Sequence, residues 1–234
     1  MPDIAVASLD LRLQRQSESA RSAFTRGRHA DAVEQCALIL QETPGCLAVR
    51  KLQRAAQLKL APAKGGFFAK AMSSVTSTPF LLSGGSALQK DPLKAAQAAD
   101  KILARDPNQT GALRMLGQAA TALGWTGTAI FAYATSREVE PDNIANLVSL
   151  GEALLAEGRG NEALPVAEEA LRLEPVHPGA QALLKNASVS STMSAGKWEA
   201  GGNYREKLRD EEKAIALEQA AKLAKKSEPP PPAP

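Results

Sequence analysis

Residues 144–177, IANLVSLGEALLAEGRGNEALPVAEEALRLEPVH, carry two helical patterns separated by a short turn. In the first pattern, apolar side chains recur at the three- and four-residue spacing of one helix face, and in the second pattern small side chains do the same. The residues that set these patterns are Leu147, Leu150, Gly151 and Leu154, then Ala163, Ala167, Ala170 and Pro175. A proline cannot continue a helix, so Pro175 ends the second one. The stretch therefore predicts a helical hairpin that buries one face.

The same pattern recurs immediately before this stretch, and its second half recurs at Ala32, Cys36, Ile39 and Pro44. Pro107, Pro141 and Pro175 are evenly spaced along the chain, and each follows an acidic residue. The positions in phase with the first stretch are Leu113, Leu116, Gly117, Ala129, Tyr133 and Pro141. Glycine and alanine thus fall where two helices must approach closely, and proline falls where one helix must end. The sequence predicts an internal repeat, and an alanine-rich bundle with accidental self-similarity is the alternative.

On these residues the chain resembles the tetratricopeptide repeat, a helix–turn–helix unit of about 34 residues. The resemblance implies an all-α fold, a right-handed solenoid of about four helical hairpins with a capping helix and a separate C-terminal helix. Such a unit cannot bury its apolar face alone, so neighbouring units stack on it. Apolar residues make up 44% of the chain and aromatic residues only 4%, which suits thin helix layers filled by alanine and leucine.

Charge and hydropathy argue against several classes of protein. The net charge of +3 is small, and the basic residues are spread along the chain, so there is no electrostatic footprint for nucleic acid. No stretch approaches the roughly 18 to 20 apolar residues of an integral membrane span. The N-terminus lacks the cationic and apolar regions of a signal peptide. We therefore expect a cytoplasmic protein.

Residues suited to chemistry are few and scattered. His29 and His177 fall in repeats that should not touch, and no GxSxG, HExxH or CxxC spacing occurs. Cys36 and Cys46 lack a histidine at ligand spacing, which favours buried free thiols over a disulfide or a metal site. We expect no enzymatic activity, no catalytic or metal site and no cofactor.

Spacing also divides the chain into segments. The interval from Pro44 to Pro107 exceeds one period by about 29 residues, so an insertion splits the second repeat. A complete repeat at 76–109 is the alternative, but it places Pro79, Gly84 and Gly85 inside a helix, where Pro costs about 3 kcal/mol and each Gly about 1. The expected segments are 1–60 (first repeat and first helix of the split repeat), 61–91 (insertion), 92–190 (remaining repeats near 110–143 and 144–177, with a capping helix at 178–190), 191–203 (linker), 204–226 (charged helix) and 227–234 (proline-rich tail).

The insertion at 61–91 is the least repeat-like part of the chain. Glycine pairs bracket an apolar segment that includes Phe67, Phe68, Phe80 and Leu81. Long loops in compact domains are usually functional or disordered. Two interpretations stay open: these side chains cover an open end of the solenoid, or they contact a partner protein or a membrane surface.

In tetratricopeptide-repeat proteins the first helices of successive repeats line a concave groove that holds a peptide or a partner helix. The resemblance carries this role to Lys51, Ala55, Leu58, Arg114, Gln118, Thr121, Val148, Glu152, Leu155, Ala182, Asn186 and Val189. One subset of the family captures acidic C-terminal peptides through a clamp of cations and amides. Val148 and Ala182 stand where this clamp needs such groups, so we expect that activity to be absent.

Two functions are consistent with these residues and with the resemblance. In the first, the protein is a non-enzymatic scaffold or adaptor that binds a partner protein in the groove, helped by the insertion. In the second, it is an architectural subunit that associates with itself or with others through residues 204–226. The sequence does not identify the partner.

Overall fold

The computed structural model describes residues 3–60 and 90–195. Contacts between residues divide the chain into two units, Met1–Ser190 and Ser191–Pro234. The described helices belong to the first unit, except for the end of the last one, which belongs to the second. In chain order the elements are η1 (Val6–Ser8), α1 (Leu11–Thr25), α2 (His29–Glu42), α3 (Leu47–Leu60), α5 (Pro92–Leu103), α6 (Thr110–Leu123), α7 (Thr126–Val139), α8 (Ile144–Ala156), α9 (Gly160–Leu173) and α10 (Pro178–Ala195).

Four of the expected segments, 61–91, 191–203, 204–226 and 227–234, fall largely or wholly outside the described residues. Phe67, Phe68, Phe80 and Leu81 of the insertion lie there, and so does the charged helix at 204–226. Among the helices that are described, none combines the length and the apolar character needed to cross a bilayer.

Polar side chains fix where several helices begin. Asp10, Asp91 and Asn143 each accept a hydrogen bond from the backbone N–H three residues later, at 2.8, 3.1 and 2.9 Å respectively. Such caps satisfy N–H groups that have no partner inside the helix. At the other end, Gly124 closes α6 with φ +73°, a left-handed conformation that glycine adopts without strain.

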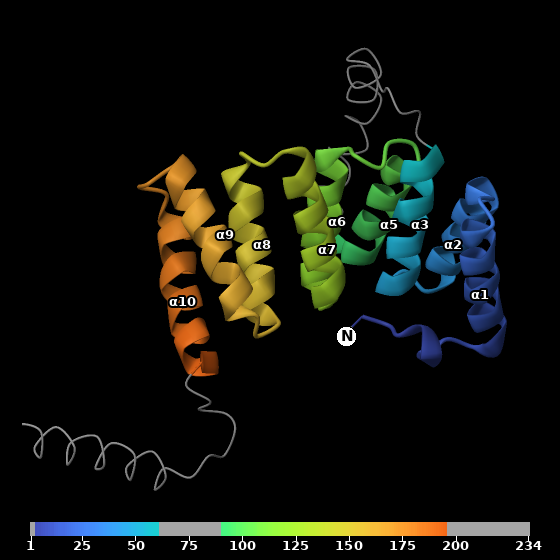
Figure 1. Cartoon of the computed structure of the whole chain (residues 1–234), viewed down its shortest axis with the longest axis horizontal. Coiled ribbons are helices and arrows are strands. Elements are labelled where there is room, and N and C mark those ends of the chain that lie inside the picture. The colour runs from blue at the N-terminus through green and yellow to red at the C-terminus, as the bar shows by residue number, and fades with distance from the viewer. Residues whose placement is uncertain (1–2, 61–89, 196–234) are drawn as a thin grey trace, which may run out of the picture. The chain divides into compact units, whose positions relative to one another are not determined.

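Successive helices pack side by side as hairpins, and the expected all-α fold of stacked hairpins is confirmed. The closely packed pairs are α1–α2, α2–α3, α5–α6, α6–α7, α7–α8 and α8–α9 (Figure 1). The predicted repeat-packing residues lie in these layers. Those that are buried are Leu113, Leu116, Gly117, Ala129, Tyr133, Leu147, Leu150, Gly151, Ala163, Ala167 and Ala170. The two prolines, Pro141 and Pro175, are exposed in the turns that follow α7 and α9.

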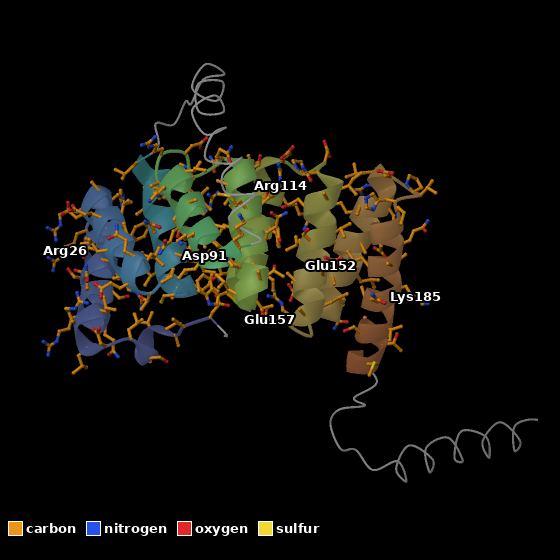
Figure 2. The ribbon with its side chains drawn as sticks, turned by 180° about the vertical axis from the view of Figure 1, so that it is seen from behind. Arg26, Asp91, Arg114, Glu152, Glu157 and Lys185 are labelled. Atoms are coloured by element: carbon orange, nitrogen blue, oxygen red, sulfur yellow. The ribbon has the colours of Figure 1, made fainter. Side chains whose placement is uncertain are left out.

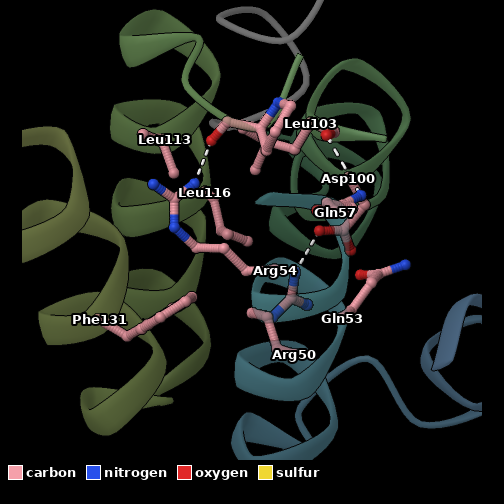
Figure 3. A pocket seen from close by; sticks show the side chains of 10 residues that line it. Arg50, Gln53, Arg54, Gln57, Asp100, Leu103, Leu113, Leu116 and Phe131 are labelled. Atoms are coloured by element: carbon pink, nitrogen blue, oxygen red, sulfur yellow. Dashed lines mark hydrogen bonds and ion pairs between the residues drawn. The ribbon is translucent and has the colours of Figure 1, made fainter. Parts of the chain in front are cut away.

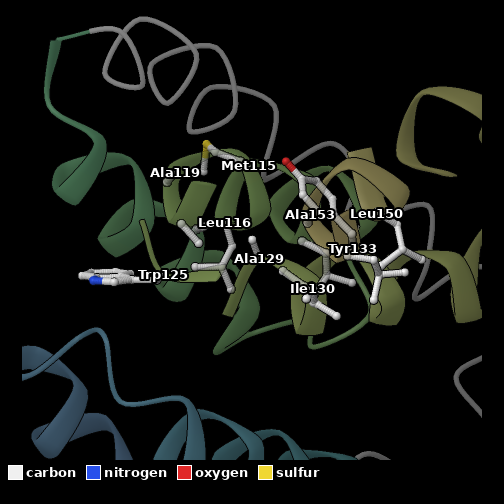
Figure 4. Packing of buried hydrophobic residues seen from close by; sticks show 14 of the residues in the cluster. Met115, Leu116, Ala119, Trp125, Ala129, Ile130, Tyr133, Leu150 and Ala153 are labelled. Atoms are coloured by element: carbon white, nitrogen blue, oxygen red, sulfur yellow. The ribbon is translucent and has the colours of Figure 1, made fainter. Parts of the chain in front are cut away.

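The closest helix approaches occur at Gly117 and Gly151. A Cβ atom at Gly117 would lie 2.5 Å from Cε1 of Tyr133, so the tyrosine ring of α7 rests directly on the backbone of α6. Gly151 of α8 is the equivalent position one period later, but the residue of α9 equivalent to Tyr133 is the small Ala167. The space over Gly151 is filled instead by Leu183 of α10, whose Cδ2 would lie 2.3 Å from a Cβ placed on the glycine. Figure 4 shows Tyr133 within this buried cluster, which also includes Leu116.

Replacing Gly117 with alanine tests this close approach. In a free helix the change stabilises by about 1 kcal/mol. Here the new methyl group overlaps the Tyr133 ring, and overpacking of this kind costs about 1–3 kcal/mol. We expect Gly117→Ala to lower the free energy of unfolding, as measured by urea denaturation.

A second background provides the control. When Tyr133 is already alanine, the overlap is gone and Gly117→Ala should stabilise the protein. Stabilisation by Gly117→Ala in the wild-type background would contradict the packing described here.

The structure does not show the hairpin that a split second repeat requires between its first helix, α3, and the helix that follows the insertion, α5. The split repeat requires α3 and α5 to run antiparallel, so that the end of α3 lies beside the beginning of α5. Instead, Gln57 near the end of α3 donates to the carbonyl of Leu103, the last residue of α5. Arg54 donates to the carbonyl of Pro107, just beyond that end. Both helices therefore end at the same edge of the row (Figure 1), and they are not among the closely packed pairs.

The physical reason is the polar face that α3 presents to α5. Arg50, with only 4% of its side chain exposed, forms an ion pair with Asp100, and Gln57 is buried beside it (Figure 3). A hydrophobic hairpin cannot form on such a face, because each buried polar group must find a partner. The buried apolar residues accordingly form separate clusters, one in α5–α10 and two smaller ones in α1–α3. We call the boundary between them the polar seam, defined by Arg50, Arg54, Gln57 and Asp100.

The N-terminal segment also crosses this boundary. The carboxylate of Asp3 accepts hydrogen bonds from the backbone N–H groups of Gly127 and Thr128, at 2.7 and 3.1 Å, and from the Thr128 hydroxyl. The next residue, Ile4, donates to the carbonyl of Gly45 at 2.9 Å. Helix α7 has no side-chain cap from its own flanking residue. Asp3 therefore caps a helix that begins more than a hundred residues later in the chain.

Removing this carboxylate should loosen the join between the two sets of helices. An N-cap replaced by alanine costs about 0.5–2 kcal/mol. We expect Asp3→Ala to reduce the free energy of unfolding by about 1–2 kcal/mol in urea denaturation, and Asp3→Asn to cost less because one accepting oxygen remains.

The matched control is Asp31→Ala, which removes an exposed carboxylate whose ion pair with Arg28 spans 3.5 Å. Exposed pairs contribute about 0–1 kcal/mol. Equal losses for the Asp3 and Asp31 variants would show that the cap contributes no more than an ordinary surface charge.

The two cysteines are free and buried, in agreement with the interpretation favoured by their spacing. Burial, and then the nearby Cys46, raises the pKa of the Cys36 thiol to about 12. A thiol this hard to ionise is a poor nucleophile at neutral pH.

Candidate protein-binding site

The expected groove positions on α6 and α8 form an accessible face. Gln118, Thr121 and Glu152 are exposed, whereas Val148 and Leu155 are half-buried and pack against the main apolar cluster. Exposed polar groups beside partly covered aliphatic side chains suit a surface that binds through packing and a few polar contacts. We define the α6–α8 face as Gln118, Thr121, Ser149 and Glu152 together with the hydroxyl of Tyr133.

Arg114 belongs to the same face of α6, but it is engaged within the protein. Its guanidinium donates to the carboxylate of Glu140 at 2.7 Å, so its charge is paired (Figure 2 labels Arg114 and Glu152). Burial alone would raise the pKa of Glu140, but hydrogen bonds from Arg114, Thr110 and Asn143 outweigh it and lower that pKa. Arg114, which the sequence predicts as a groove residue, therefore binds Glu140 at the end of α7.

The hydroxyl of Tyr133 reaches the α6–α8 face from α7 beneath it. Only 4% of the residue is exposed, and burial raises the pKa of its phenol. Hydrogen bonds with Thr121 of α6 and Ser149 of α8 act in the opposite direction, while the negative charge of Glu152 raises the pKa further. One buried ring thus joins side chains from three helices.

The remaining groove positions are dispersed. Asn186 and Val189 are exposed on α10, which reaches α8 through the contact of Leu183 with Gly151. Lys51 and Leu58 are exposed on α3, about a quarter turn around the helix from the residues that meet α5. Because α3 belongs to the other side of the polar seam, no described contact joins these two residues to the α6–α8 face.

A small hollow lies at the polar seam between α3, α5, α6 and α7 (Figure 3). Its walls include Arg50, Arg54 and Asp100 on one side and Leu116 and Phe131 on the other. The Arg50 Nε atom is buried there without a hydrogen-bond partner. The guanidiniums are otherwise engaged with Asp100 and with backbone carbonyls, so the hollow works as part of the interface between the helices.

Both histidines pack within the fold, and Nδ1 of His29 is buried without a hydrogen-bond partner. Nδ1 of His177 accepts from the backbone N–H of Ala180 at 3.2 Å and caps α10, and the ring of His29 lies 5.2 Å from that of Phe24. Within residues 3–60 and 90–195, no group of three or more His, Cys, Asp or Glu side chains is placed to hold a metal ion.

The period and the packing together decide the fold. Hairpins α6–α7 and α8–α9 occupy successive units of the sequence repeat, the small residues lie at the helix contacts, and a proline follows each second helix. The hairpins have the tetratricopeptide-repeat fold. Their first helices, α6 and α8, carry the α6–α8 face.

Comparison with known proteins gives fold-level likenesses only. No family model and no curated protein matches the chain. Among solved structures, a Thermobaculum terrenum O-GlcNAc transferase mutant shares 24% identity over 49% of this chain, with a TM-score of 0.45, and the match spans 22% of that chain. MamA shares 16% identity over 94% of this chain and 98% of its own, with a TM-score of 0.47. The yeast Sti1 TPR2AB domain, in complex with pHSP90, shares 18% over 75% and 69%, with a TM-score of 0.45.

Sequence reasoning missed two features of the site. It treated Tyr133 only as a packing residue and did not single out Ser149, although the hydroxyls of both residues meet at the face. The signal in the sequence was Tyr133 itself, because the equivalent position of the next repeat holds a small residue, Ala167. A phenol at a small-residue position must direct its hydroxyl towards polar groups.

The pairing of Arg114 predicts a structural role for this residue. The two side chains are 32% and 45% exposed, so the ion pair should contribute no more than about 1 kcal/mol. We expect Arg114→Gln to lower the melting temperature by a few degrees, corresponding to a loss below about 1 kcal/mol. The comparison is Arg172→Gln, an exposed arginine near the end of α9, which should leave the melting temperature unchanged. An unchanged melting temperature for Arg114→Gln would contradict the structural role.

Proposed function

We propose that this protein is a non-enzymatic scaffold that binds a segment of a partner protein across the first helices of its repeats, α6, α8 and α10. The observation that supports this most is the α6–α8 face, where Gln118 and Thr121 of α6 and Glu152 of α8 are exposed. The half-buried Val148 and Leu155 add apolar area beside them. A helix or an extended segment of a partner meets such a surface through packing and a few polar contacts.

The chemistry of the face distinguishes it from a clamp for acidic peptides. Such a clamp needs free cations, whereas Arg114 is paired with Glu140 and the positions of Val148 and Ala182 carry no charge. The acid exposed at the centre of the face, Glu152, would repel a carboxylate. We therefore propose a partner other than an acidic C-terminal peptide.

The absence of enzymatic activity is part of the proposal. The histidines cap or pack within the fold, and the Cys36 thiol is held protonated by burial. These are the residue types that most often serve as general base or nucleophile, and here each has a packing role.

Site-specific photocrosslinking tests the proposed surface. A photoreactive amino acid placed at Gln118 or at Asn186 should crosslink the same partner protein in the native cell, because both positions belong to one binding surface. The same group placed at Glu168, an exposed residue on the second-helix side of the chain, is the control. We expect no crosslink to that partner from the control position.

The outcome that contradicts the proposal is equally specific. If Gln118, Asn186 and Glu168 give the same crosslinked proteins, the first helices carry no distinct binding surface. A partner found through Gln118 must also bind the purified chain in solution.

A further inference from the structure

The second helices α2, α7 and α9 can be compared position by position, because a glycine with positive φ precedes each of them. These glycines are Gly27, Gly124 and Gly158. At α2 and α9 the next residue is an arginine that pairs with an acid in the first turn. Arg28 lies 3.5 Å from Asp31, and Arg159 lies 2.6 Å from Glu162. Both helices thus carry a carboxylate of their own at the end where the helix dipole favours negative charge.

Helix α7 lacks this pair. Trp125 stands in place of the arginine and Thr128 in place of the acid. Thr128 is 0% exposed, and its hydroxyl donates to the carboxylate of Asp3. The acid that α2 and α9 supply themselves therefore reaches α7 from another segment of the chain.

The first turn of α7 is shaped for this carboxylate. The backbone N–H groups of Gly127 and Thr128 donate to Asp3 at 2.7 and 3.1 Å. A Cβ atom at Gly127 would lie 3.0 Å from Oδ2 of Asp3 and 2.9 Å from Cδ2 of Leu47, so a side chain at this position would obstruct the carboxylate. Two N–H groups and one buried hydroxyl thus converge on a single acid.

The turn before α3 binds the next residue of the same segment. The carbonyl of Gly45 accepts the backbone N–H of Ile4 at 2.9 Å, and the Ile4 side chain packs against the apolar cluster that includes Cys46 and Val49. We call the first-turn donors of Gly127 and Thr128, together with the carbonyl of Gly45, the α7 carboxylate site. Its walls come from both sides of the polar seam.

The segment that fills this site is held at few points. No side chain from Asp3 to Ser8 is buried, and Leu9, 6% exposed, is the first one that is. The short helix η1 within the segment contains no buried residue. Segments with few buried contacts open at low free-energy cost. The segment can therefore leave the site without unfolding of the helices.

We propose that the α7 carboxylate site recognises an extended segment of a partner protein in which an acidic residue is followed by an aliphatic one, and that residues 3–9 fill the site as a tethered ligand. The first turn offers three donors to one side chain, which matches a carboxylate and repels a lysine or arginine. The carbonyl of Gly45 requires a free backbone N–H at the next residue, and the cluster beside it requires an aliphatic side chain. None of these residues belongs to the α6–α8 face.

A dye-labelled peptide with the sequence of residues 3–9, DIAVASL, tests the site by fluorescence anisotropy on the full chain. In the wild type the tethered segment competes with the peptide, whereas in Asp3→Ala this competitor lacks its carboxylate. We expect the peptide to bind Asp3→Ala about fivefold more tightly than the wild type, the factor that corresponds to a typical N-cap. A peptide with alanine in place of its aspartate should show no such gain.

Variants of Thr128 in the Asp3→Ala chain locate the effect. Thr128→Val removes the hydroxyl at nearly constant volume and should abolish most of the gain, whereas Thr128→Ser keeps the hydroxyl and should retain it. The control is Thr25→Val, which removes an exposed hydroxyl that bonds only within α1 and should change nothing. Circular dichroism checks that each variant is folded.

The ligand chemistry is tested by a displayed library of random peptides, selected on the immobilised Asp3→Ala chain and eluted with the DIAVASL peptide. We expect the enriched peptides to share an acid followed by an aliphatic residue. Equal affinity of DIAVASL for wild type and Asp3→Ala, no measurable binding to either, or enriched peptides without a shared acid would each overturn the site. None of these results bears on the scaffold function of the α6–α8 face.

Discussion

The contact between the Tyr133 ring and the backbone of Gly117 is the constraint on which the packing of the repeats and the α6–α8 face both depend. Because position 117 has no Cβ, the ring of Tyr133 lies directly on the backbone of α6. The same geometry fixes how closely α6, α7 and α8 pack. A shift of the ring would therefore change both the helix packing and the surface formed by α6 and α8.

The polar seam separates the helices that carry the α6–α8 face from the N-terminal helices. On one side, α5–α10 share a continuous apolar cluster and carry the α6–α8 face. On the other side, α1–α3 have small clusters of their own and meet α5 through Arg50, Gln57 and a few turn contacts. A buried ion pair contributes little net stability, because the cost of removing both charges from water offsets much of their attraction. Asp3 adds a cap on α7, and Trp125 and Leu47 pack across the same boundary on Gly45 and Gly127, so polar and apolar contacts together position the N-terminal helices.

The sequence predicted the hairpins well where the signals, the repeat period and the residues that end a helix, depend only on neighbouring residues. Pro141, Pro175 and the cap at Asn143 mark ends that depend only on neighbouring residues, and the hairpins at 110–143 and 144–177 form as expected. The predicted antiparallel orientation of α3 against α5 was wrong. The long stretch of sequence between the two helices permits either direction, and the only signal against a hydrophobic hairpin was the pair of polar residues Arg50 and Gln57 on one face of α3. The cap by Asp3 has no local signature at all, because donor and acceptor lie more than a hundred residues apart.

Titration of the Tyr133 phenol tests the central claim most directly, since the claim is that this hydroxyl is buried beside a carboxylate on the α6–α8 face. The chain has one other tyrosine, Tyr204, so a Tyr204→Phe variant reports Tyr133 alone by its ultraviolet absorbance. The account predicts ionisation above the ordinary tyrosine value of about 10, while circular dichroism shows the helices intact, and a lower pKa when Glu152 is replaced by Gln. Ionisation at the ordinary value, unaffected by Glu152→Gln, would contradict it.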